Sequence, residues 1–328
     1  MPAIAQNPRD DWRYLKYSFR ARDHPDLAED IFEARGVRWS ALNELPGWLP
    51  AESSPVDFMH CVMLCMIKHL NRNILYNYGM YNSSSRREDP IATIEDFFKS
   101  IIWPSSTGRL PPSMAHGAGS VKADQWRTQI SVLPIALYLI WGKDGRMLED
   151  LLTKNPNASD EAKDEIDSIT MDRSYHPHYN AILEFTAAIR ILASRSISPA
   201  DVKRAFMILS HAIQTWAKMH CHLTPYFHLA LHMESQFLRY GPAYGWWTYP
   251  YERNNGFLGR FNHNGHAGGE IEGTMMRGWW KATLIQQLVR ISSSNMFSPN
   301  LKLRLGILRI SLTRLMRTRS PSNSSDHI

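Results

Sequence analysis

The sequence predicts a mostly α-helical protein, and three observations support this prediction. Apolar residues recur at helical spacing in several segments, proline-rich loops separate these segments, and few stretches alternate as half-buried strands do. Of the 328 residues, 44% are hydrophobic and 11% are aromatic. This is enough apolar material for a sizeable core in one large domain or two small ones, so we expect the chain to fold.

Two segments carry a complete helix start. Ser54-Pro55-Val56-Asp57 combines a serine cap, a proline at the first helical position and a carboxylate near the exposed N–H groups. Ser198-Pro199-Ala200-Asp201 repeats this pattern, and apolar residues follow both starts at helical spacing. In chain order, further helices are expected over about residues 24–35, 93–102, 122–141, 177–194, 225–238, 273–292 and 299–317.

Loops divide these helices into parts. They are expected over residues 103–119, which contain three prolines, and over residues 240–251, which are rich in glycine, proline and aromatic residues. The boundaries predict four parts: a helix and loop lead-in over 1–54, a helical domain over 55–292, a basic amphipathic helix over 293–319, and a disordered tail over 320–328.

Cysteine usage and hydropathy indicate the compartment. Three cysteines in a chain of this length cannot form a disulfide framework, which favours a reducing, intracellular environment. The N-terminus lacks the apolar core of a signal peptide. The longest apolar run, residues 133–141, is much shorter than the ~20 residues of a membrane span. We expect a soluble protein without a membrane partner, and no pattern indicates a small-molecule substrate.

Positive charge is concentrated near the C-terminus. The formal net charge is +6, yet residues 273–325 contain nine Lys or Arg and no Asp or Glu. Within residues 299–317, leucines form an apolar stripe that cations surround. These cations are Lys302, Arg304, Arg309, Arg314 and Arg317. Such a helix is typical of salt-sensitive contact with DNA phosphates or of contact with a partner, and the alternative is a solvated face. DNA binding would place the protein in the nucleus.

Four ordered segments carry a resemblance to a known family. Residues 36–46 lead into Pro55–His60, and residues 122–127, 223–232 and 241–253 follow. In this order and spacing they resemble the downstream part of transposases of CACTA (En/Spm-like) elements, of the fungal type, over residues 25–290. The resemblance implies a DDE transposase. Its ribonuclease-H-like core is interrupted by a helical insertion before the last acidic residue.

The resemblance also implies a catalytic site. In this family three carboxylates hold two Mg²⁺ ions about 3.5–4 Å apart. Asp57-x-x-His60 matches the signature that follows the second catalytic aspartate, and Glu252 matches the last acid. The first two aspartates belong before Asp57, where the sequence indicates helix and loop. We therefore expect a truncated chain, inactive alone, with core strands largely missing, Mg²⁺ without a function, and Glu252 as a remnant or simply a helix-opening residue.

Two pairs of residues suggest a structural Zn²⁺ site. Asp57 and His60 lie one helical turn apart, and His228 and His232 share a helix face. Brought together, the two pairs would supply four ligands to one tetrahedral Zn²⁺, similar to the clasp of the related immune-receptor recombinase. The alternative is that Asp57 caps a helix and the histidines form local hydrogen bonds.

Two functions remain open at this point. The chain is either a transposase-derived protein that binds DNA, a transposase partner or itself, or a helical interaction protein with no DNA role. A complete nuclease is the third possibility. It would require Mg²⁺-dependent nicking that Glu252→Ala abolishes, and we expect no nicking.

Overall fold

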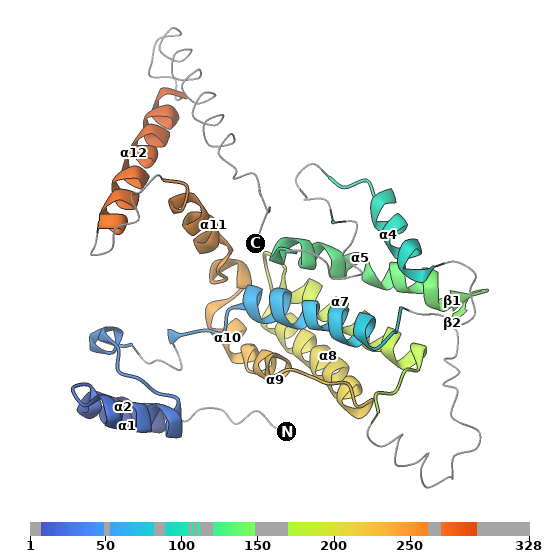
Figure 1. Cartoon of the computed structure of the whole chain (residues 1–328), viewed down its shortest axis with the longest axis horizontal. Helices are drawn as coiled ribbons and strands as arrows, with labels where there is room; N and C mark the ends of the chain where they lie inside the picture. The colour runs from blue at the N-terminus through green and yellow to red at the C-terminus, as the bar shows by residue number, and fades with distance from the viewer. Residues whose placement is uncertain are drawn as a thin grey trace, which may run out of the picture. The chain divides into compact units, whose positions relative to one another are not determined.

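A computed structural model describes residues 8–48, 53–81, 89–104, 107, 110–111, 121–147, 170–261 and 270–293. Within these residues the chain is mostly helical, as predicted (Figure 1). The chain divides into two compact units, Met1–Trp247 and Thr248–Ile328. Among the described residues, no helix combines the length and the apolar composition that a membrane span requires.

Two packed helices open the first unit. They are α1 (Pro8–Ala21), which was not predicted, and α2 (Pro25–Arg35), which confirms the helix expected over 24–35. Proline opens α2, and Gly36 ends it with φ 68°, donating its N–H to the carbonyl of Phe32. A short 3₁₀ turn, η1 (Ala41–Glu44), follows, and the Ser40 side chain caps it.

A buried helix follows over residues 58–77 and consists mainly of π-helical turns, η2 (Met59–Ile67) and η3 (Leu70–Asn77). The predicted start at Ser54 is wrong. The helix begins after Asp57, whose carboxylate accepts the His60 N–H at 2.7 Å. A tertiary contact accompanies the later start, since the Val56 N–H donates to the side-chain oxygen of Gln236 at 3.1 Å. Gln236 thus takes the place of the serine cap that the sequence predicted for this N–H.

The next elements are α4 (Pro90–Ser100), α5 (Ala123–Trp141) and a two-stranded hairpin, β1 (Gly142–Lys143) and β2 (Arg146–Met147). The Asp89 side chain caps α4, so this helix starts three residues before the predicted position. Asp144 and Gly145 both have positive φ, which suits a tight hairpin turn. No other strand occurs in the described ranges, and they contain no ribonuclease-H-like sheet.

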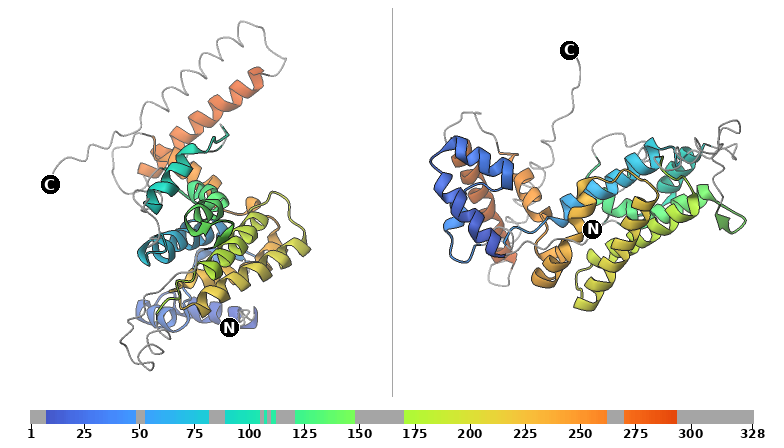
Figure 2. Two further views of the ribbon diagram at one scale, coloured as in Figure 1. Left: turned by 90° about the vertical axis from the view of Figure 1, so that its right-hand side faces the viewer. Right: turned by 90° about the horizontal axis from the view of Figure 1, so that it is seen from below.

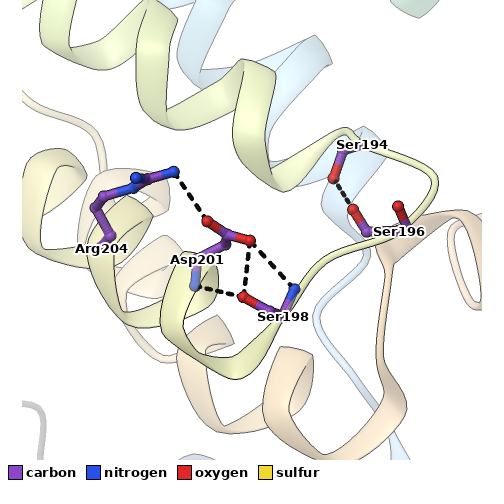
Figure 3. Close-up of polar contacts among 5 residues, drawn as sticks. All are labelled: Ser194, Ser196, Ser198, Asp201 and Arg204. Atoms are coloured by element: carbon purple, nitrogen blue, oxygen red, sulfur yellow. Dashed lines mark hydrogen bonds and ion pairs between the residues drawn. The ribbon is translucent and has the colours of Figure 1, made fainter.

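The helices α7 (Tyr175–Leu192) and α8 (Pro199–Lys218) form a helical hairpin and lie side by side in all views (Figures 1 and 2). The predicted start of α8 is confirmed. The Ser198 hydroxyl accepts the Asp201 N–H at 3.1 Å, and the Asp201 carboxylate accepts the Ser198 hydroxyl at 2.7 Å (Figure 3). Both ends of this reciprocal cap therefore come from the four residues that the sequence singled out.

The single helix predicted over 225–238 is wrong, because the chain forms α9 (Pro225–Leu231) and α10 (Met233–Tyr240). The break falls at His232, where the backbone N–H bonds to the Leu229 carbonyl and tightens the turn. After the break, the Phe237 ring lies 5.6 Å from that of Phe58, between ring centroids. A 3₁₀ turn, η5 (Ala243–Gly245), follows.

The core of the first unit lies among the 58–77 helix, α5, α7, α8 and α9. Large buried rings fill it, and the Trp216 ring contacts those of Phe185 and Phe227 edge to face. One buried polar cluster joins helices that are distant in sequence, because Gln129 on α5 donates to the Asn71 side-chain oxygen at 2.6 Å. Pairing keeps these buried amides satisfied.

The second unit contains α11 (Tyr249–Leu258) and α12 (Glu270–Ser293), and α12 confirms the helix expected over 273–292. The two helices contact each other. Gly278 on α12 allows a close approach of the Phe261 ring, because a Cβ at this position would lie 2.6 Å from a ring carbon. The helix expected over 299–317 and the tail expected over 320–328 lie outside the described residues.

Candidate functional site

Asp57 and His60, the first predicted metal pair, contact each other. The His60 Nδ1 atom lies 2.6 Å from Oδ2 of Asp57, and the same oxygen accepts the His60 backbone N–H. The Asp57 side chain is 16% exposed and that of His60 is 50% exposed. The helix-capping role considered for Asp57 is therefore confirmed, and it uses Oδ2 of the carboxylate.

His228 and His232, the second predicted pair, also contact each other, although they straddle the end of α9. Their Nε2 atoms lie 3.1 Å apart. Burial, with a smaller contribution from neighbouring His228, lowers the pKa of His232, which favours a neutral ring. Two ligand atoms around a tetrahedral Zn²⁺ lie about 3.3 Å apart for bonds of about 2.0–2.1 Å. The spacing therefore fits two zinc ligands, and it fits one hydrogen bond between the rings equally well.

The two pairs do not combine into one four-ligand cluster. In the described part of the chain, no three His, Cys, Asp or Glu side chains lie close enough together to hold a metal ion. The pairs nevertheless come from neighbouring segments, since α9 packs against η2. Only the histidine pair has the spacing of two zinc ligands, because Nδ1 of His60 and Oδ2 of Asp57 lie 2.6 Å apart, and zinc binding stays a prediction.

Glu252, the predicted remnant of the last catalytic acid, lies in the second unit. It is exposed in the first turn of α11, and its N–H donates to the Thr248 carbonyl at 2.9 Å. A carboxylate in the first turn stabilises a helix through the helix dipole. This position fits the helix-opening interpretation of Glu252.

The predicted DNA-binding cations of the C-terminal helix lie outside the described residues. They are Lys302, Arg304, Arg309, Arg314 and Arg317. Their contact with DNA therefore stays a prediction from sequence.

The structure shows a second basic surface that the sequence analysis missed, on α1. Arg13, Lys16 and Arg20 are exposed on one side of this helix, while Leu15 and Ser18 are buried on the other. With 3.6 residues per turn, the three cations share one face, roughly opposite the buried one. We call Arg13, Lys16, Tyr17 and Arg20 the α1 basic face. Their spacing of three and four residues was visible in the sequence, but no helix was expected over residues 8–21.

Tyr17 lies within this face and is 42% exposed. A hydrogen bond from Arg13, together with the charges of Arg13, Arg20 and Lys16, lowers the pKa of the Tyr17 hydroxyl. The three cations are therefore close enough to act on one group. Among the described residues, no carboxylate forms an ion pair with Lys16 or Arg20, and Glu29 of α2 pairs with Arg38 instead, at 2.8 Å.

No protein-family model matches the chain, and neither a curated protein nor a solved structure matches it significantly. The resemblance to CACTA transposases therefore rests on the four sequence segments. The candidate sites rest on the described side chains alone.

Proposed function

We propose that the chain is a transposase-derived helical protein that binds nucleic acid through the α1 basic face. The observation that carries the proposal is the alignment of Arg13, Lys16 and Arg20 on one exposed side of α1. From Arg13 to Arg20 the helix rises about 10 Å. One strand of a duplex presents a phosphate about every 3.4 Å of axis, so about three phosphates lie within this length. Charge and length thus match a short stretch of nucleic-acid backbone.

The exposed ring of Tyr17 adds a second type of contact. Phosphate contacts carry no sequence information, so binding through the cations alone is independent of sequence. An aromatic ring beside the cations can stack on an unpaired base, as in proteins that bind single strands. The proposal therefore includes both duplex and single-stranded nucleic acid. The predicted basic helix over 299–317 would add further phosphate contacts.

The experiment that tests the proposal is fluorescence anisotropy with a labelled random-sequence duplex and the full chain. The triple variant Arg13→Gln, Lys16→Gln and Arg20→Gln removes three charges from the α1 basic face. We expect its affinity at low salt to fall by at least about tenfold, because three phosphate contacts are lost. Thermal melting must show that the variant is folded.

A matched variant controls for the loss of net charge. Arg190→Gln, Lys203→Gln and Lys218→Gln remove three exposed cations from α7 and α8. This control should bind within about twofold of the unaltered chain, since dispersed charges act only through the screened long-range field. Equal losses in the two variants, or no loss in the α1 variant, would refute the proposed interface.

The alternative function is a helical interaction protein without a DNA role, and one observation favours it. Large apolar side chains are exposed every fourth residue along α12, at Met276, Trp280, Leu284 and Leu288. Contiguous exposed apolar side chains mark interaction surfaces. If the unaltered chain binds neither duplex nor single strands at low salt, this alternative is favoured.

A further inference from the structure

One side of α12 carries a continuous row of exposed apolar side chains. Met276, Trp280, Leu284 and Leu288 follow one another at intervals of four residues, and each is 46–58% exposed. Residues four positions apart are neighbours on a helix surface, so the four form one ridge. Ala282, on the other side of the helix, is buried. We call the four residues the α12 stripe, and such a contiguous apolar surface is typical of a site that another element covers.

The next helix expected in the chain, over residues 299–317, has a matching apolar stripe. Ser298-Pro299 precedes it and repeats the two residue types that open α8. Its leucines recur after four, three, four and three residues, which is the spacing of helices that pack lengthwise against each other. They are Leu301, Leu305, Leu308, Leu312 and Leu315. These residues lie outside the described part of the chain, so the match rests on their sequence.

The connection between α12 and this segment is short. The helix α12 ends at Ser293, and five residues, 294–298, separate it from Pro299. Five residues span at most about 18 Å even when they are fully extended. Connections of about two to eight residues in helical proteins join antiparallel neighbours. The length of the connection therefore favours a segment that turns back along α12.

Antiparallel packing about this connection predicts which residues face each other. Both helices rise about 1.5 Å per residue, so positions at equal distances from the turn come together. Met276 lies 17 residues before Ser293, and Leu315 lies 17 residues after Ser298. In the same register Leu284 lies beside Leu308. The two apolar stripes therefore meet along most of their length.

Charge at the ends of the two stripes supports the same register. One helical turn before Met276 lies Glu272, which is exposed and forms no ion pair with a described cation. One turn beyond Leu315 lies Arg319, so the register brings opposite charges together. Antiparallel pairing of the α12 stripe with a second copy of itself would instead bring Glu272 near Ser292, which carries no charge. The sequence thus favours the chain's own segment over a second copy.

We infer that residues 299–317 fold back on α12 as the second helix of a helical hairpin and cover the α12 stripe. By helical periodicity Lys302, Arg309 and Arg317 lie off the leucine stripe, so they stay available for phosphate contacts. With a partner inside the chain, the α12 stripe no longer indicates an external one. The inference is independent of the proposed nucleic-acid interface, because α1 takes no part in the hairpin.

Paired cysteines in the full chain test the hairpin. A disulfide forms only where two Cα atoms come within about 7 Å of each other. Met276→Cys with Leu315→Cys places thiols at facing positions. Met276→Cys with Leu301→Cys is the matched control, because Leu301 lies about 21 Å further along the second helix. Cys65→Ser removes the half-buried native thiol from both variants, and the other two native thiols are buried.

Under mild oxidation we expect the facing pair to form an internal disulfide at least about tenfold faster than the control pair. Mass spectrometry of digested protein measures the crosslink. Adding Leu312→Gln, on the leucine stripe, should slow closure of the facing pair at least about fivefold. Adding Arg314→Gln, off the stripe, should leave the rate unchanged. Circular dichroism must show that each variant is folded.

Three outcomes would overturn the inference. They are equal closure rates in the two pairs, no internal disulfide in the facing pair, and covalent dimers in its place, which would assign the α12 stripe to a second copy. These measurements use no nucleic acid, so their failure leaves the α1 basic face as it stands. Failure of the duplex-binding experiment likewise leaves the hairpin to the crosslinking rates.

Discussion

At the residue scale, Asp57 caps the start of a helix with one of its carboxylate oxygens. Its Oδ2 accepts both the backbone N–H and the ring Nδ1–H of His60, at the start of a buried helix. Replacing a capping side chain with alanine destabilises a protein by about 0.5–2 kcal/mol. We expect Asp57→Ala to lose about 1 kcal/mol in urea denaturation and Asp57→Asn, which still caps, to lose much less. Equal losses would show that the cap is not the cause.

The same variants separate capping from zinc binding. A capping defect is independent of metal, so the loss in Asp57→Ala should be the same with and without a chelator. A four-ligand clasp instead requires about one zinc per chain in purified protein, and lower zinc content in both Asp57→Ala and His232→Ala. Zinc-free protein, with melting that a chelator does not change, would remove the zinc prediction.

His178 makes stability depend on pH. It is fully buried, its Nε2 donates to the Asp172 carbonyl at 2.8 Å, and burial lowers its pKa. An unfolded histidine has a pKa of about 6.5, so the unfolded chain takes up a proton first as the pH falls. This contribution to stability is complete above about pH 6.5 and is lost as the pH falls through the lower, folded pKa.

We therefore expect urea denaturation to show less stability at about pH 5 than at about pH 7, and a smaller difference in His178→Gln. His69 shifts in the same direction, so part of the dependence should remain. The exposed His24 offers a matched control, and His24→Gln should behave as the unaltered chain does. If His178→Gln kept the full pH dependence, the buried ring would not be its source.

At the element scale, the cap of α8 shows a helix start that local sequence determines. The hydrogen bonds of the reciprocal cap join Ser198 and Asp201, three residues apart, and Arg204 also donates to the Asp201 carboxylate (Figure 3). We expect Ser198→Ala to destabilise the protein by about 1 kcal/mol. Ser196 in the same turn contributes a backbone carbonyl, which accepts the Ser194 hydroxyl, so Ser196→Ala is a matched control. Thermal melting checks both, and a similar change in the two variants would contradict the capping role.

Helices were predictable where such local signals exist, and α2, α5, α8 and α12 lie close to their expected positions. Tertiary contacts explain the failures. The bond between Val56 and Gln236 joins residues 180 positions apart, and it gives the Val56 N–H a partner other than the serine cap that the sequence predicted. The break at His232 likewise places Phe237 in the core, and a continuous apolar pattern gives no sign of it.

The candidate sites show the same difference between features set by local sequence and features set by tertiary packing. Spacing within one helix was informative, so the contacts between Asp57 and His60, and between His228 and His232, were predictable. Whether two such pairs meet depends on packing between distant segments, which spacing does not encode. The α1 basic face was also local, yet it was missed because no helix was expected over residues 8–21.

At the scale of the whole molecule, the chain combines two compact units with an uneven charge distribution. The α1 basic face lies in the first unit, and the strongly basic sequence over 273–325 belongs to the second. Contact of nucleic-acid phosphates with both basic regions would make the affinity for nucleic acid strongly dependent on salt. The contribution of the α1 basic face to this affinity can be assigned to described side chains, so it provides the sharper test.

That test is the slope of the logarithm of the duplex-binding constant against the logarithm of salt concentration. Each phosphate contact contributes about −0.9 to this slope. We predict that the Arg13→Gln, Lys16→Gln and Arg20→Gln triple variant makes the slope shallower by about 2.7, while the control triple on α7 and α8 leaves it unchanged. Identical slopes for the α1 variant and the unaltered chain would contradict the central claim that the α1 basic face contacts nucleic-acid phosphates.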